Sequence, residues 1–259
     1  MGIGVVIAPS DYAIAKSLGF DHVELSGRNI AAMGECEFRA LCKMIDAQTP
    51  CLGLNAYCPP TVRIAGPGFD IGAASEYAQR LAPRAKALGA QVVGIGSPFS
   101  RDLPADYDRV RAWDEAAQFF KETAAVFAPY NIDVCVEALG PCYCNFINLT
   151  DEAIALAKAA DEPNLQVVLD FYNMEHSGEA ALELAPRMGS VRHVHMSDDD
   201  GDPKKRWFFR ADKLDAHRAR LHKLRELGYQ GHVTIEIDLP IEARAAQMSL
   251  DALKRRNVI

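Results

Sequence analysis

The chain has no surplus of basic residues: 28 lysines and arginines stand against 35 aspartates and glutamates, a formal net charge of −7. A chain of this charge has no general attraction to the phosphate backbone of nucleic acids or to anionic membranes, although a local basic patch could still form. Nucleic acid is therefore disfavoured as a partner, and no membrane partner is expected.

No segment has the composition of a signal peptide or a membrane-spanning helix. The apolar run at 1–8 has no basic region before it, and Pro9, Ser10 and Asp11 end it short of a membrane-spanning length. The 7 cysteines are an odd number in a chain without an export signal, a pattern typical of reduced thiols. We therefore expect a cytoplasmic protein without disulfides.

The sequence also lacks a Ser/Gly/Pro-rich linker, a low-complexity segment and a Gly-x-Gly-x-x-Gly motif after any predicted strand. Its 259 residues, 49% of them hydrophobic, are enough to bury one large core. These features favour a single domain over 1–259. They disfavour an open, doubly wound sheet that binds a dinucleotide.

Strand-like and helix-like runs alternate along the whole chain. Short apolar runs predict strands at 3–8, 22–25, 51–57, 91–96, 133–137, 166–170, 191–195 and within 228–238. Helical spacing predicts helices at 11–18, 35–48, 73–88 with a kink or break at Pro83, 114–127, from Thr150, 179–188, 213–227 and 241–256. Eight such units predict an α/β protein with a (β/α)8 TIM barrel, whose active site lies at the C-terminal ends of the strands.

A polar residue ends each of the last four predicted strands: Glu137, Asp170, His195 and Glu236. For any one of them, the ordinary explanation is a partnered polar residue at a strand exit. The recurrence of the same position in four consecutive units favours a shared site instead. Two Glu, one Asp and one His offer oxygen and nitrogen ligands, which suit Mn²⁺, Mg²⁺, Co²⁺ or Zn²⁺ without selecting one.

Several motifs carry a resemblance to a known family. They are Gly19-Phe-Asp-His-Val-Glu-Leu25, Leu169-Asp-Phe-Tyr-Asn173, His193-Val-His-Met-Ser-Asp198, and Gly228-Tyr-Gln-Gly231 with Ile235-Glu236. Through these motifs nearly the whole chain resembles the xylose isomerase-like superfamily. It is most similar to the sugar-phosphate isomerase/epimerase branch, which includes ketose 3-epimerases, hydroxypyruvate isomerases, inosose isomerases and inosose dehydratases.

By position, the resemblance implies that Glu137, Asp170, His195 and Glu236 bind one divalent metal ion, for which we expect Mn²⁺ ahead of Mg²⁺, Co²⁺ and Zn²⁺. In the epimerases the two glutamates also act as acid and base on opposite sides of the substrate. Glu137 and Glu236 are therefore the predicted catalytic residues. A bound cation would stabilise the enediolate that forms when a proton leaves the carbon beside a carbonyl. His193, inside its strand, is expected to be structural.

Further residues are expected to bind the substrate. Asn55 and Tyr57 at the third strand could hydrogen-bond a polyol, and Glu24 could contact substrate from the second, with an ordinary partnered acid as the equal alternative. Asn173 stands where relatives commonly have a substrate-contacting His, and His176 follows three residues later.

Two further differences from the family's pattern concern charged residues. Tyr143 stands where the epimerases place an acid, which puts the ordinary 3-epimerase reaction in doubt. The family's Arg shortly after the strand-seven His has four candidates in this chain, of which we choose Arg206 as substrate-binding; the others are Lys204, Lys205 and Arg210.

The leading hypothesis is an isomerase or epimerase of a small sugar, hydroxy-carbonyl acid or cyclitol ketone that acts through an enediolate. A sugar or inosose dehydratase would use the same site but expel a β-hydroxyl. A phosphodiesterase resembling endonuclease IV and a non-catalytic sugar-binding barrel are the remaining alternatives. The expected partner is a small sugar or polyol. Trp207 and Phe208 could cover a ligand or a subunit interface, so a homo-oligomer is compatible with the sequence.

Overall fold

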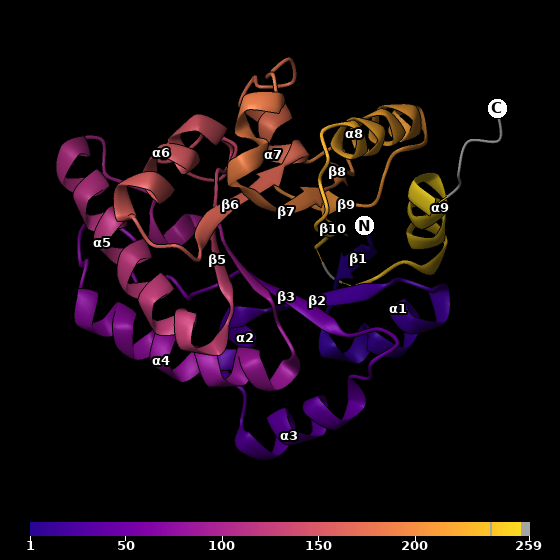
Figure 1. Cartoon of the computed structure of the whole chain (residues 1–259), viewed down its shortest axis with the longest axis horizontal. Helices are drawn as coiled ribbons and strands as arrows, with labels where there is room; N and C mark the ends of the chain where they lie inside the picture. Colours follow the sequence, from indigo (N-terminus) through magenta and orange to yellow (C-terminus); the bar gives the residue numbers. More distant parts are fainter. Residues whose placement is uncertain (239, 255–259) are drawn as a thin grey trace.

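The structure is a computed structural model that describes residues 1–238 and 240–254. Arg255 and Arg256, at the end of the predicted last helix, lie outside the described residues. Eight parallel strands close into a barrel in the order β1-β10-β7-β6-β5-β4-β3-β2. Helices surround this barrel on its outside (Figure 1). The predicted (β/α)8 TIM barrel is confirmed.

The bounds of the elements follow the predicted alternation. The barrel strands are β1 Ile3–Val6, β2 His22–Ser26, β3 Cys51–Asn55, β4 Val92–Ile95, β5 Asp133–Glu137, β6 Leu165–Asp170, β7 Val191–Met196 and β10 Val233–Ile235. The helices are α1 Tyr12–Leu18, α2 Gly27–Ala32, α3 Glu35–Met44, α4 Ile71–Leu88, α5 Arg109–Phe127, α6 Thr150–Ala160, α7 Phe171–His176, α8 Leu214–Glu226 and α9 Ala243–Lys254. Across 1–238 and 240–254, no helix combines the length and apolarity that crossing a membrane requires.

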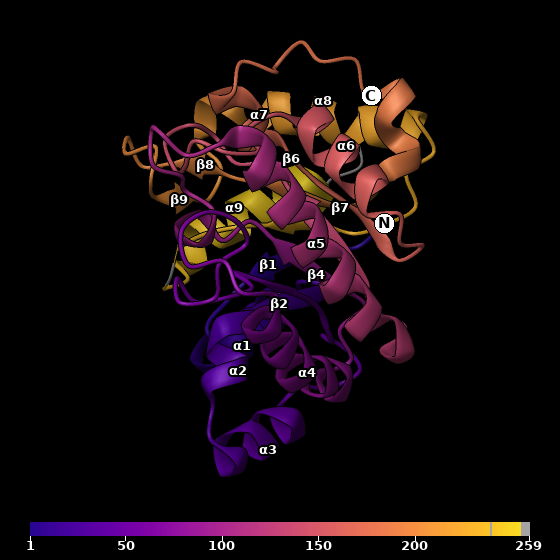
Figure 2. The ribbon, with the colours of Figure 1, turned by 90° about the vertical axis from the view of Figure 1, so that its left-hand side faces the viewer.

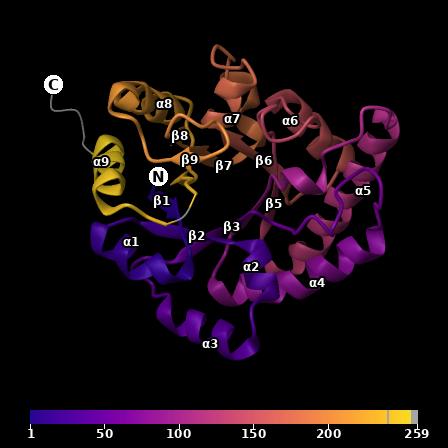
Figure 3. The same cartoon turned by 180° about the vertical axis from the view of Figure 1, so that it is seen from behind.

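One short antiparallel ladder interrupts this pattern. In the loop after β7, the strands β8 (Asp198–Asp199) and β9 (Arg206–Trp207) pair with each other. β8 begins two residues after the end of β7. The two short strands lie beside β7 in Figure 3 and together at the left in Figure 2. Trp207 is partly buried, and Phe208 is fully buried in the main hydrophobic core.

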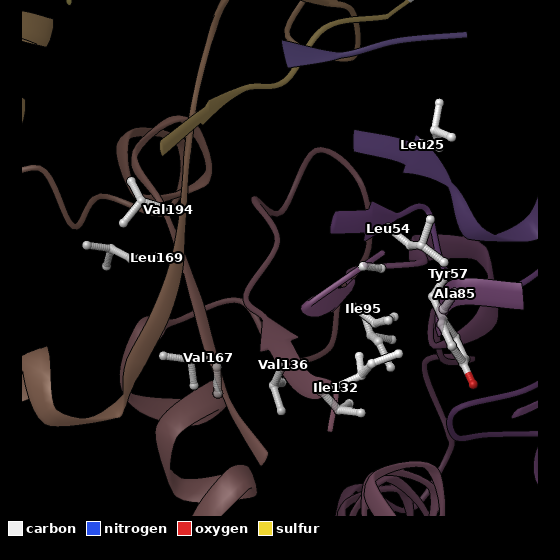
Figure 4. Close-up of a cluster of buried hydrophobic side chains, with 14 of the residues drawn as sticks. Leu25, Leu54, Tyr57, Ala85, Ile95, Ile132, Val136, Val167, Leu169 and Val194 are labelled. Atoms are coloured by element: carbon white, nitrogen blue, oxygen red, sulfur yellow. The ribbon is translucent and has the colours of Figure 1, made fainter. Parts of the chain in front are cut away.

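The main core lies between the barrel and its helices. Successive residues of a strand point to opposite faces of the sheet. Outward-facing strand residues such as Leu54, Val136 and Leu169 therefore join helix residues such as Ala85 in one buried cluster (Figure 4). The residues between them point into the barrel, where the apolar part is a small separate cluster of Val92, Cys135 and Val168.

Most of the barrel interior is polar, and inward-facing glycines make room for it. A Cβ atom at Gly4 would overlap the imidazole ring of His22. A Cβ at Gly53 would lie 2.8 Å from the carboxyl carbon of Glu24. The interior therefore holds bulky polar groups only because the facing residues have no side chain.

This packing makes Gly4→Ala a test of the interior. The His22 ring is fully buried, and its Nε2 lies 2.8 Å from the hydroxyl of Thr234, so it has little room to move. Overpacking at such a site should lower the free energy of unfolding by about 2–3 kcal/mol, measured from urea denaturation. Gly189→Ala is the control, because a Cβ there has no neighbour within 4 Å. Equal stability of the two variants would contradict this account of the interior.

The segment 179–188, predicted as the sixth helix, is not an α-helix. The α7 helix instead follows β6 directly, because the carboxylate of Asp170 accepts hydrogen bonds from two backbone N–H groups of its first turn. The carboxylate of Glu179 lies at the start of α6, where it accepts hydrogen bonds from the backbone N–H and the hydroxyl of Thr150. Only a short 3-10 helix at Ala185–Ser190 follows.

Two other helices also differ from the prediction. The α4 helix runs unbroken through Pro83, whose ring is exposed. The carbonyl left without a helical partner belongs to Gln79, which is also exposed, so that water can satisfy it. The six-residue α2 helix was not predicted, and its start is capped by the hydroxyl of Ser26.

Candidate metal centre and active site

The barrel brings four predicted ligands together at the C-terminal ends of its strands. Glu137 ends β5, Asp170 ends β6, His195 lies near the end of β7, and Glu236 directly follows β10. One possible ligand atom from each lies within 4.8 Å of those of the others. The first three side chains are buried and Glu236 is partly exposed. The grouping agrees with the predicted metal site.

The two ring nitrogens of His195 face different surroundings. Nε2 lies 3.2 Å from the carboxylate Oε2 of Glu24. Nδ1 lies 3.6 Å from Oε1 of Glu137 and 3.4 Å from Oε2 of Glu236, and it has no hydrogen-bond partner among the described residues. Nδ1 is therefore the nitrogen that could bind a cation between the two glutamates.

The guanidinium of Arg206 lies among the same carboxylates. Its Nη2 is 2.7 Å from Oδ2 of Asp170 and 3.9 Å from Oε1 of Glu137, and its Nη1 is 3.0 Å from Oε2 of Glu236. Nη1 also donates a hydrogen bond to the hydroxyl of Ser197. Arg206 thus compensates part of the negative charge that the three acids would otherwise bury together.

Its position is fixed from several sides. The backbone N–H of Arg206 donates to the carboxylate of Asp238. The guanidinium lies 4.9 Å from the ring centre of Tyr172 and 5.7 Å from that of Tyr143, so both rings can stabilise the cation. This contact is the structural role of Tyr143, the residue that departs from the family's acid.

Burial and neighbouring charges shift the pKa values of the two acids that end β5 and β6 in opposite directions. Burial, followed by the charge of Glu236, raises the pKa of Glu137 to about 7. Burial also acts to raise the pKa of Asp170, but the charges of Arg206 and His195 outweigh it and lower that pKa to about 2. One carboxyl group can therefore exchange a proton near neutral pH, while the other stays ionised.

A cavity of about 150 Å³ opens beside this group. This volume is below the range of about 300–1,000 Å³ that is typical of sites for drug-sized ligands, so only a smaller ligand fits. Glu137, Arg206 and Glu236 form its polar floor. The walls combine apolar, hydroxyl and basic side chains, among them Leu139, Phe99, Ser97, Ser100, Arg28 and Lys204. A ligand in this cavity would contact the carboxylates directly.

The donor set fits a divalent cation. Nδ1 of His195, which faces the group, has no hydrogen-bond partner among the described residues. Oε2 of Glu236 faces this nitrogen and the guanidinium of Arg206. Three carboxylates and one imidazole suit the hard or borderline ions Mg²⁺, Mn²⁺, Co²⁺ and Zn²⁺. Geometry does not choose among these ions.

Besides Arg206, two of the six residues predicted to bind substrate lie at the carboxylates. Asn55 donates a hydrogen bond of 3.3 Å from Nδ2 to Oε1 of Glu236. Asn173 donates from Nδ2 to Asp170 at 3.0 Å and to Glu137 at 3.3 Å, and its Oδ1 accepts from a backbone N–H at Gly140. Both amides therefore orient the acids of the site.

Of the six predicted substrate contacts, only Arg206 lines the cavity. Glu24 is buried inside the barrel, where its carboxylate contacts His193 and His195. Tyr57 is fully buried and packs against Tyr77 in the main core (Figure 4). His176 packs on the ring of Tyr172, 4.4 Å away between ring centres. Direct contact of these three with a substrate does not fit these positions.

The prediction missed cavity residues on the loop after β4. Ser97 and Phe99 line the cavity, and the Phe99 side chain is 67% exposed. Their signal was available, because Gly96 ends a predicted strand, as the metal candidates do, and Ser97 directly follows it. Arg28 on α2 had no such signal, since that helix was not predicted.

Comparison with known proteins identifies the family of this chain. A family model described as "Xylose isomerase-like TIM barrel" matches residues 12–256. A D-psicose 3-epimerase of Ruminiclostridium cellulolyticum is 24% identical over 230 residues, which cover 86% of this chain and 75% of that protein.

Solved structures share the fold. The D-psicose 3-epimerase with D-tagatose from Clostridium cellulolyticum H10 has a TM-score of 0.76 at 18% identity, and the match covers 98% of both chains. The IolI protein with a bound zinc atom has a TM-score of 0.74 at 17% identity, and the match covers both chains completely. Together with the family model, these matches show that the chain belongs to the xylose isomerase-like TIM barrel family.

Proposed function

We propose that the protein is a divalent-metal-dependent isomerase or epimerase of a small sugar or related hydroxy-ketone. The observation that carries this proposal is the pair Glu137 and Glu236. Their carboxylates lie 3.6 and 3.4 Å from the free Nδ1 of His195, and both face one small cavity. Two carboxylates at one small-molecule site suit the removal and return of a proton.

Glu137, Asp170, His195 and Glu236 would hold the cation. When bound, the cation would supply positive charge beside the substrate's carbonyl oxygen, where an enediolate develops negative charge. We expect Mn²⁺, and Zn²⁺ in the IolI structure supports the same class of ion.

The two glutamates would divide the proton transfer. One carboxylate accepts the proton from the carbon beside the carbonyl, and that C–H electron pair forms the C=C bond of the enediolate. The other carboxylic acid returns a proton to carbon, and the carbonyl re-forms. Burial and the charge of Glu236 raise the pKa of Glu137 to about 7. A bound cation would lower this pKa again, so Glu137 would have to hold the cation loosely to act as the base.

Three neighbours would hold the reacting groups in place. Arg206 carries the positive charge nearest to Asp170 and Glu236, so it can also bind a substrate oxygen. Asn55 and Asn173 hold the carboxylates of Glu236 and Glu137 by hydrogen bonds. This support limits how far the two proton carriers can move.

The relatives support a sugar as the substrate. One distant homologue is a D-psicose 3-epimerase, and a solved D-psicose 3-epimerase of the same fold is described with D-tagatose. At 24% identity the exact ketose stays open, so the test must include several.

The test combines metal analysis with isotope exchange. We expect about one divalent ion per chain, and we expect deuterium from D₂O at the carbon beside the carbonyl of D-fructose, D-psicose, D-tagatose or an inosose. Chelation should abolish the exchange, and Mn²⁺ should restore it. A product lighter by one water would instead identify a dehydratase. Isomerisation without any deuterium uptake would indicate a hydride shift and contradict the proposal.

A further inference from the structure

A buried carboxylate joins two histidines inside the barrel, below the metal site. Oε1 of Glu24 lies 2.5 Å from Nε2 of His193, and Oε2 lies 3.2 Å from Nε2 of His195. All three side chains are at most 3% exposed. Burying a carboxylate is costly unless hydrogen bonds satisfy it, and these imidazoles are its hydrogen-bond partners.

The trio is not itself a cation site. Two ligand atoms bound to one cation at the usual bond lengths of about 2.0–2.2 Å stand about 3 Å apart. The 2.5 Å separation between Glu24 and His193 is too short for that arrangement and matches a hydrogen bond. Glu24 therefore acts on the histidines and not on a second metal ion.

We propose that Glu24 is a positioning residue that prepares His195 to bind the cation. Its Oε2 accepts the proton of Nε2, so that a cation displaces a proton only at Nδ1, whose lone pair is then directed between Glu137 and Glu236. His193 holds the other oxygen of Glu24 and keeps the carboxylate in this orientation. The inference rests on the proposed metal centre.

The neighbouring strand is built around this carboxylate. Gly53 on β3 faces Glu24, and a Cβ atom at that position would lie 2.8 Å from both Cγ and Cδ of Glu24. The carboxylate therefore has neighbours on the side away from the histidines as well. With both oxygens bonded, its orientation toward His195 is fixed.

The first test measures Mn²⁺ affinity, from the electron paramagnetic resonance signal of free Mn²⁺. Glu24→Gln should weaken binding at least about tenfold, because the neutral amide is a weaker acceptor and can rotate to offer its NH₂ group. His193→Gln should weaken it less, since His193 acts only through Glu24. His22→Gln is the control, because His22 is equally buried but bonds Thr234 instead. Wild-type affinity in Glu24→Gln would overturn the inference.

The second test needs no variant. In wild-type protein with ¹⁵N-labelled histidine and bound Zn²⁺, two-bond ¹H–¹⁵N correlations should show the His195 proton on Nε2. A proton on Nδ1 would overturn the positioning role. Failure of wild-type protein to bind either Mn²⁺ or Zn²⁺ would contradict the metal centre itself, whereas normal binding with the other tautomer would contradict only the role of Glu24.

Discussion

Glu137→Gln is expected to lower the rate of deuterium exchange by about 10³-fold, within the range that positioned acid–base groups contribute. The amide keeps the size of the carboxylate but cannot accept a proton. It also removes one anionic ligand from the group, so the bound metal should decrease too. The rate is measured with the best ketone of the panel and is expressed per bound Mn²⁺, so that loss of metal and loss of the base are separated.

Glu175→Gln is the matched control. Glu175 lies on α7, pairs with Lys213 and Arg220, and does not line the cavity. Its loss should leave the exchange rate per metal unchanged. An exchange rate in Glu137→Gln equal to that of the wild type would remove Glu137 from the proton transfer and leave Glu236 as the candidate.

The grouping of the four ligands could be predicted because parallel strands of a barrel all end on the same side. Glu137 and Asp170 are the last residues of their strands, and Glu236 is the first residue after its strand. A strand end is visible in the sequence as the end of an apolar run. Position along the strand was therefore enough to place these side chains in one group.

The depth of Glu24 in the barrel could not be predicted in the same way. It points into the barrel as expected, but it is the middle residue of β2, two positions before Ser26. Residues two apart on a strand share a face but differ in depth. Glu24 therefore lies in a deeper layer of the interior, where it reaches histidines and not the cavity.

The predicted substrate contact of Tyr57 does not fit the structure, for a different reason. Asn55 and Tyr57 are two apart, so a continuous strand would point both into the barrel. The β3 strand ends at Asn55, and Ala56 follows with φ of 42°, in the left-handed region that few residues other than glycine adopt. This turn breaks the alternation and directs Tyr57 into the main core. An alanine in this conformation has no signal in the local sequence.

Arg206 is the residue predicted among four basic candidates, but no local pattern in the sequence explains why this residue lies at the carboxylates. Its partner in the β8–β9 ladder is Asp199, and this pairing returns the chain across the mouth of the barrel. Two-residue strands are too short to produce an alternating pattern in the sequence. The loop could be predicted as polar, but the short ladder that directs Arg206 toward the carboxylates could not.

The second large loss of deuterium-exchange rate is expected when a glycine beside Glu137 is replaced by alanine. Gly96 follows β4, and a Cβ atom there would lie 2.5 Å from Oε2 of Glu137 and 3.1 Å from Cδ2 of Leu139. Gly96→Ala should therefore displace the Glu137 carboxylate from its position near His195. A displacement of about 1 Å at a reacting group can cost about 10²-fold in rate, so we expect a loss of that size in deuterium exchange. The backbone at Gly96 does not have a positive φ, so alanine adds no backbone strain there.

Gly94→Ala separates this effect from a general response of the strand. Gly94 lies on β4 two residues before Gly96, but a Cβ there would make only ordinary contacts, the nearest at 3.4 Å from Val168. Both variants should fold, as judged by circular dichroism and the urea midpoint, and Gly94→Ala should keep its exchange rate within a few-fold of wild type. A crystal structure of Gly96→Ala should show Glu137 displaced. If Gly96→Ala instead exchanges deuterium as fast as Gly94→Ala, the position of the Glu137 carboxylate does not control the reaction, and its role as the proton carrier fails with it.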